Sequence, residues 1–186
     1  SLLAGENRNL NDYVSFLGAG AYDHFIPSVV KHIISRSEFY TSYTPYQAEI
    51  SQGILQVYFE YQSMICELTK MDVSNASMYD GATALAEAVL MASNTNNRKK
   101  VLMPKQVHPE YRAVVKTYTK NLGISIEEIN YNDGVLDLEE LKKKCNDETC
   151  AVVIHQPNFF GCIEDVLEIE KIVHNRGAIF ISCVDP

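Results

Sequence analysis

The chain has 186 residues, of which 46% are hydrophobic and 22% charged, and it carries a formal net charge of −8. This length and composition fit one globular domain with a sizeable core and exclude a collagen-like or disordered chain. The 24 acidic residues outnumber the 16 basic ones, which argues against nucleic acid as a partner. No apolar run approaches the ~20 residues of a membrane span, and no basic region precedes an apolar core at the N-terminus, so we expect neither a membrane segment nor an export signal.

The five cysteines are odd in number and have no CxxC spacing. Most of them lie inside apolar runs. We therefore expect reduced thiols in a cytoplasmic protein, with neither disulfides nor a metal site.

Residues 1–40 are predicted to form an N-terminal arm with a short helix, because apolar residues fall at helical spacing over 26–34 and Pro27 suits a first turn. An aromatic-rich loop follows, and the clearest helix of the chain is expected over 50–68. The loop carries more tyrosines than a routine connector needs. This composition predicts contact with a partner subunit.

The second part of the chain alternates short apolar strands with amphipathic helices. Strands are expected at 99–103, 124–129, 150–155 and 178–183. Helices are expected at 82–91, at 111–122, from Asp137 onward and at 166–173. The third of these begins with a capping box, which Glu140 completes. The succession predicts a mostly parallel α/β sheet covered on both faces, with ligands at the carboxyl ends of its strands.

The turn Asp80-Gly81-Ala82-Thr83 leads into a helix rich in small residues. Gly81 frees the backbone, Thr83 offers a hydroxyl, and the helix N-terminus supplies free amides, which together favour a phosphate cradle. The alternative is that Asp80 is an ordinary N-cap. The turn matches neither GxGxxG nor the Walker pattern.

Two further candidates follow strands. His108 lies where an imidazole could stack on a flat ring or move a proton, or else it caps a helix that has Pro109 in its first turn. Asp185 closes the last strand, where a carboxylate could hold a protonated ring nitrogen or cap a helix that follows.

The loop from His155 to Gly161 leaves the most apolar strand with three polar residues in a row. This pattern suggests the wall of a polar pocket. A turn held by Pro157, Asn158 and Gly161 explains the same sequence.

In this order, the motifs resemble the pyridoxal-phosphate (PLP) enzymes of the aspartate-aminotransferase superfamily, and more closely the glycine cleavage system P-protein family, in particular the alpha chain of its two-subunit bacterial form. The likeness covers essentially the whole chain. It is carried by FLGAGAYDH at 16–24, SEFYT at 37–41, YTPYQ at 43–47, EISQG at 49–53 and NASMYDGATA at 75–84.

The resemblance implies a three-layer α/β/α, fold-type-I PLP-transferase large domain. Residues 41–186 would be its N-terminal part, truncated at the C-terminus, since only four strands are seen and the small C-terminal domain is missing. On this view the sequence is a piece of a protein more than twice as long.

The resemblance also implies oxidative glycine cleavage, in which glycine is decarboxylated with PLP and the aminomethyl group passes to the lipoylated H-protein. No lysine here occupies a plausible Schiff-base position, so no catalytic residue is expected in this chain. The lysine and the covalently bound PLP would belong to glycine dehydrogenase subunit 2, the beta chain.

By position, the superfamily's cofactor contacts map onto Gly81, Ala82, Thr83, His108 and Asp185. These residues are positional equivalents, and the resemblance does not require this chain to bind PLP through them. Tyr43, Tyr46 and Gln47 are expected to reach toward the partner's glycine and cofactor. The alternatives are a non-catalytic assembly subunit and a nucleotide-binding α/β domain, the latter without a glycine fingerprint.

Overall fold

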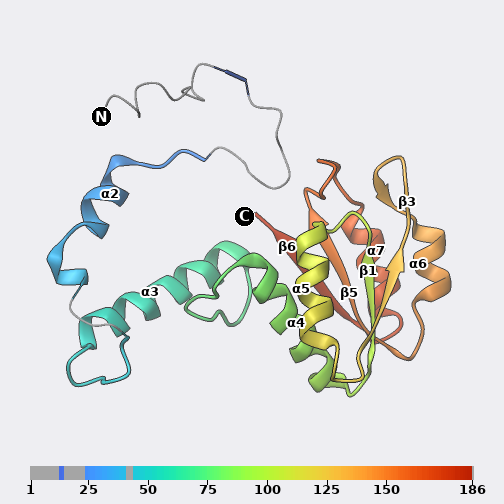
Figure 1. Ribbon diagram of the computed structural model, residues 1–186, viewed down its shortest axis with the longest axis horizontal. Coiled ribbons are helices and arrows are strands. Elements are labelled where there is room, and N and C mark those ends of the chain that lie inside the picture. The colour runs from blue at the N-terminus through green and yellow to red at the C-terminus, as the bar shows by residue number, and fades with distance from the viewer. Residues whose placement is uncertain (1–12, 15–23, 41–43, 186) are drawn as a thin grey trace.

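The computed structural model describes residues 13–14, 24–40 and 44–185. Within them, four strands form a parallel sheet in the order β2-β1-β5-β6 (Figure 1). The strands are β1 (Lys100–Pro104), β2 (Ser125–Ile129), β5 (Thr149–Gln156) and β6 (Ile179–Val184). The expected parallel sheet is confirmed, with every predicted strand within two residues of its observed ends.

Four helices cover the sheet: α4 (Gly81–Asn96), α5 (Pro109–Thr119), α6 (Leu138–Lys144) and α7 (Val166–His174). Alternate residues of each central strand enter different cores, since Val101 and Met103 pack with α4 and α5 while Leu102 packs with α6 and α7. Val153 and Ile154 of β5 divide in the same way. The result is the predicted α/β/α layering. Residues 150–155 and 178–183 form the near-continuous apolar runs expected of strands covered on both faces, and β5 is buried accordingly, whereas no residue of the edge strand β6 is buried.

The N-terminal part of the described chain lies to one side of this unit (Figure 1). It contains α2 (Ser28–Ile34), the 3-10 helix η2 (Ser37–Phe39) and the long α3 (Gln52–Thr69). No residue of these three helices is buried. The apolar stripe that predicted α3 is therefore largely open to solvent in this structure.

A short antiparallel hairpin, β3 (Tyr131–Asn132) with β4 (Val135–Leu136), was not predicted. Its two-residue turn is formed by Asp133 and Gly134, both with positive φ. Asp-Gly is a preferred sequence for such turns. The turn signal was present, but strands of two residues are too short to produce a periodic pattern.

The capping box predicted for α6 is right for Asp137 and wrong for Glu140. Asp137 caps the helix by accepting the backbone N–H groups of Glu139 and Glu140. The Glu140 carboxylate does not return to Asp137, because it accepts hydrogen bonds from the backbone and side chain of Asn130 and pairs with Lys144.

None of the described helices combines the length and apolar character needed to cross a membrane. All five cysteines are free thiols, and Cys145 and Cys150 are buried.

Candidate functional site

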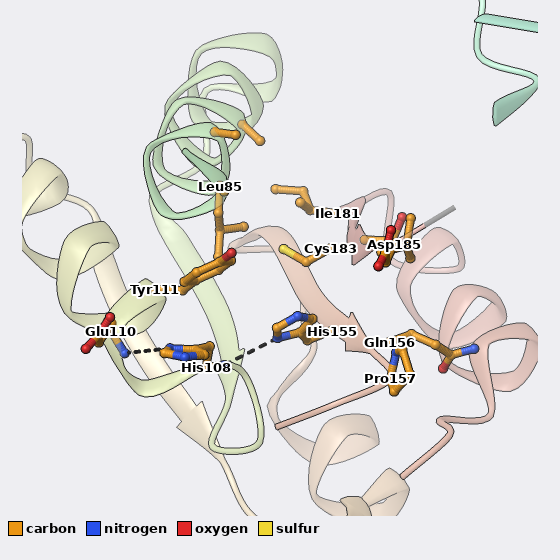
Figure 2. Close-up of a pocket in the computed structure, with 15 residues that line it drawn as sticks. Leu85, His108, Glu110, Tyr111, His155, Gln156, Pro157, Ile181, Cys183 and Asp185 are labelled. Atoms are coloured by element: carbon orange, nitrogen blue, oxygen red, sulfur yellow. Dashed lines mark hydrogen bonds between the residues drawn. The ribbon is translucent and has the colours of Figure 1, made fainter. Parts of the chain in front are cut away.

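A cavity of about 540 Å³ opens at the carboxyl ends of β5 and β6, beside the first turns of α4 and α5 (Figure 2). We call it the strand-end cavity. Its apolar wall includes Leu85 and Ile181, and its polar wall includes His108, Tyr111 and His155. The location is the one expected for ligand sites of parallel sheets.

His108 caps a helix, which is one of the two roles proposed from the sequence, while stacking on a ligand ring or moving a proton stays a prediction. Its Nδ1 accepts the Glu110 backbone N–H at 3.2 Å, which makes it the N-cap of α5, and Pro109 occupies the first turn. The ring also lines the strand-end cavity. The His108 backbone N–H donates to Nδ1 of His155 at 3.4 Å, which links the start of α5 to the end of β5.

Three rings stand together in the cavity wall. Tyr111 stacks on His155 with centroids 5.6 Å apart and an interplanar angle of 14°, and its ring lies 5.1 Å from that of His108. Burial lowers the pKa of His155, and the nearby His108 lowers it further. Tyr111 was expected only as an apolar helix residue, and its position one helical turn after His108 was the signal that could have found it.

The thiol of Cys183 faces the same cavity and was also not singled out from the sequence. Burial raises the pKa of Cys183 to about 11 and also raises the pKa of Tyr111. At neutral pH both groups are protonated. The Cys183 and Tyr111 side chains are thus uncharged, although the carboxyl groups of Glu110 and Asp185 also line the cavity.

The expected phosphate cradle is filled by groups of the chain itself. The Asp80 carboxylate accepts the Thr83 backbone N–H at 2.7 Å and its hydroxyl at 2.8 Å, and the Asp80 N–H donates to Thr83 Oγ1 at 3.2 Å. This is a complete capping box. It lowers the pKa of Asp80, chiefly through the Thr83 backbone hydrogen bond, and Ala82 is buried in the core.

Gly81 lines the cavity, but Tyr111 closes over it. A Cβ built on Gly81 would lie 2.9 Å from Cζ of Tyr111. Among the described residues that line the cavity, none is lysine or arginine. The residues at this helix N-terminus therefore do not fit the phosphate of PLP, since a carboxylate and a phenol ring stand where phosphate would need free amides and space.

Asp185 lines the mouth of the cavity, as expected, and is bound from the N-terminal side of the chain. Nε2 of His24 lies 2.7 Å from Oδ2 of Asp185, and both side chains are about half exposed. A residue just before α2 thus contacts the end of β6.

Two of the three interface candidates, Tyr46 and Gln47, do not lie at this cavity. Tyr46 is 90% exposed, and Gln47 is exposed with its carbonyl accepting the Ile50 backbone N–H. Neither lines the cavity. Tyr43 lies outside the described residues.

The loop after β5 again combines the two interpretations made from the sequence. His155, Gln156 and Pro157 line the cavity, whereas Asn158 is fully buried and Gly161 has a φ of +79°. The Asn158 side chain donates to the carbonyl of Gly134 at 2.7 Å, so it holds the turn. The loop is both a pocket wall and a fixed turn.

Residues 2–186 match the family of the glycine cleavage system P-protein. A relative from Desulforamulus reducens named probable glycine dehydrogenase (decarboxylating) subunit 1 is 60% identical over 184 residues, which cover 99% of this chain and 41% of the relative. A protein of the same name from Bacillus cereus is 55% identical over 186 residues, covering 100% of this chain and 42% of its own length. The chain thus spans about two fifths of the curated relatives it matches.

A crystal structure of glycine decarboxylase (P-protein) of the glycine cleavage system, in inhibitor-bound form, superposes with a TM-score of 0.89 and 44% identity, over 100% of this chain and 41% of that one. A NifS-like protein shares the fold at a TM-score of 0.68 and 17% identity, over 91% of this chain and 48% of that one. These likenesses confirm the expected fold-type-I PLP-enzyme architecture. The chain belongs to the glycine cleavage system P-protein family.

Proposed function

We propose that this chain is part of subunit 1 of a glycine decarboxylase and completes an active site formed with a second subunit. The observation that carries the proposal is the 60% identity to a glycine dehydrogenase subunit 1 over 99% of the chain. The name "subunit 1" of these relatives supports a heteromeric enzyme. The reaction would be PLP-dependent decarboxylation of glycine, followed by transfer of the aminomethyl group to the lipoylated H-protein, in the bacterial cytoplasm.

PLP, when bound, supplies an electron sink that stabilises negative charge at the α-carbon of glycine as CO2 leaves. The second subunit would hold the cofactor and supply the lysine. Two features of this chain support that division: the capped N-terminus of α4, and the lack of lysine among the described residues lining the strand-end cavity. Gly81, Ala82, Thr83, His108 and Asp185 would then be positional equivalents without bound PLP.

The contribution of this chain to chemistry would come from the aromatic loop. Tyr46 and Gln47 are exposed next to α3, which buries none of its residues. Tyrosine and glutamine combine contact area with hydrogen-bonding tips, which suits a site shared between subunits. Tyr43, Tyr46 and Gln47 would orient glycine and exclude water at the partner's cofactor.

A second candidate function is a purely structural subunit that keeps the fold for assembly. The closed cradle at Asp80 and Tyr111 favours it, because a chain that has lost its own site needs only its surface. In that case the aromatic loop packs against the partner without touching glycine.

The test combines full-length subunit 1 with the second subunit and measures glycine-dependent CO2 exchange. We expect Tyr43→Phe and Tyr46→Phe to lower exchange by tenfold or more without weakening assembly, whereas Tyr118→Phe on α5 serves as the control and leaves exchange unchanged. Normal exchange in both loop variants would favour the assembly role. Borohydride trapping of PLP on a lysine of this chain would contradict the assignment of the cofactor to the partner.

A further inference from the structure

A buried carboxylate lies behind the strand-end cavity. Glu164, between β5 and α7, is 6% exposed and accepts three hydrogen bonds. The donors are the Asn158 side chain at 2.7 Å, the Gln106 side chain at 3.1 Å and the Leu136 backbone N–H at 2.9 Å. Within the described residues no cationic side chain pairs with Glu164.

The donors belong to separate segments that the carboxylate ties together. Gln106 lies between β1 and α5, two residues before His108, and Leu136 belongs to β4. Asn158 directly follows Pro157 of the cavity wall. In addition, the Glu164 backbone N–H donates to Oε1 of Gln156, another residue of that wall, at 2.9 Å.

A second link joins the same two loops. The Phe159 backbone N–H donates to the Gln106 carbonyl at 2.9 Å, and the Phe159 and His108 rings form a T-shaped contact with centroids 5.1 Å apart. The loop carrying His108 and the loop that follows His155 are therefore fixed to each other through Gln106, Asn158 and Glu164. A buried charge held only by neutral donors is costly unless every donor is aligned, so this network defines the geometry of both loops.

We propose that Glu164 is a positioning residue, which holds the His108–His155 pair in register at the strand-end cavity. It does not line the cavity and acts through Gln106, Asn158 and Gln156. The inference concerns the cavity of this chain and goes beyond the proposed activity of the complex.

The decisive variant is Glu164→Gln. An amide offers one oxygen where the carboxylate offers two. Its oxygen can keep the Asn158 and Gln106 donors, but its NH2 group then faces the Leu136 backbone N–H, which loses its acceptor. The loops then separate, the contact between the His108 N–H and His155 Nδ1 lengthens, and water reaches the His155 ring. Other titratable groups sharing the cavity with His155 are His108, Glu110, Tyr111, Cys183 and Asp185.

The measurement is an NMR titration of ring-labelled histidine in the full chain. In Glu164→Gln we expect the ring signals of His108 and His155 to move, and the pKa of His155 to rise toward its ordinary value as burial is lost. Glu87→Gln is the control, since it removes the same charge from the exposed face of α4. If Glu164 only stabilised the fold, the variant would have a lower melting temperature, but the signals of His108 and His155 would not change more than those of other histidines.

A second variant covers the case in which Glu164→Gln does not fold. Gln106→Met keeps the side-chain length, removes one donor to Glu164 and also removes the buried Gln106 Oε1, which has no hydrogen-bond partner among the described residues. It should stay folded and shift the His108 signals. Unchanged His108 and His155 signals in a folded variant would overturn the proposal, whereas a wild-type complex without glycine-dependent CO2 exchange would contradict only the proposed function.

Discussion

Three side chains in the wall of the strand-end cavity, His155, Tyr111 and Cys183, are shifted toward their neutral forms. Burial lowers the pKa of His155 and raises those of Tyr111 and Cys183, so each group favours the uncharged state near pH 7. Asp185 is at the mouth, where it meets His24. A dianionic phosphate entering this cavity would find no lysine or arginine among the described lining residues, and at the N-terminus of α4 the Thr83 amide is already bound to Asp80.

Cys183 allows a direct test of this neutral interior. Because its pKa is raised to about 11, only about one part in a thousand is thiolate at pH 8, and the folded chain should react slowly with iodoacetamide at this position. The raised pKa also means that thiolate, and with it reactivity, increases about tenfold per pH unit up to pH 10. Mass spectrometry of the labelled peptides measures the rate.

The pH slope separates a raised pKa from simple steric protection. A thiol with an ordinary pKa would level off near pH 9, and the chain unfolded in urea supplies that reference. A plateau below pH 9.5 for Cys183 in the folded chain would contradict the neutral interior.

At the scale of elements, sequence patterns located the helices and strands because each has an apolar stripe or run that matches its period. They missed what depends on distant partners. Glu140 fits a local capping box, yet Asn130 and Lys144 compete for its carboxylate in the folded chain. Glu164 gave no local signal at all, because its three donors lie 6, 28 and 58 residues away in the sequence.

In the candidate site, too, the features with a local sequence signal were predicted and those that depend on distant contacts were missed. From the βαβ order, His108 and Asp185 could be placed after strands and Gly81 at a helix N-terminus, and all three line one cavity. The closure of Gly81 by Tyr111 could not be foreseen, because it depends on how closely α5 packs on α4. The distance between two packed helices cannot be predicted from the sequence of either helix alone.

The two helices α4 and α3 should respond in opposite ways to the same glycine substitution. In Gly81→Ala the new Cβ meets the Tyr111 ring, 2.9 Å from Cζ, so the ring must move and the free energy of unfolding should fall by about 1–3 kcal/mol. In the control, Gly53→Ala in the first turn of α3, the Cβ has no atom within 4 Å among its described surroundings. Alanine should there be neutral or stabilise the helix by up to about 1 kcal/mol.

Urea unfolding measures both changes. Adding Tyr111→Phe removes the hydroxyl nearest to the new methyl group and should recover part of the loss in Gly81→Ala. Equal stability of Gly81→Ala and the unmodified chain would mean that Tyr111 does not close the cradle in solution.

The α/β unit and the N-terminal helices differ in how many apolar side chains they bury. The sheet with α4 to α7 has two buried clusters, one on each face. The helices α2 and α3 have no buried residue, although both carry many apolar side chains. An apolar helix of 18 residues, none of them fully buried in the described structure, needs cover from elsewhere, which agrees with the second subunit proposed above.

Charges placed on the apolar stripe of α3 should therefore affect association and spare the α/β unit. Val57 and Tyr61 are one turn apart on the same face and both are exposed. Burying each against the second subunit would contribute about 1.5–3 kcal/mol, so Val57→Lys with Tyr61→Lys should weaken association by about 100-fold or more.

The matched control, Gln56→Lys with Ser63→Lys, adds the same charge at exposed polar positions. Sedimentation with the second subunit gives the affinity and thermal unfolding gives the stability. A large drop in melting temperature would show that α3 stabilises its own chain, and unchanged affinity would place the subunit interface elsewhere.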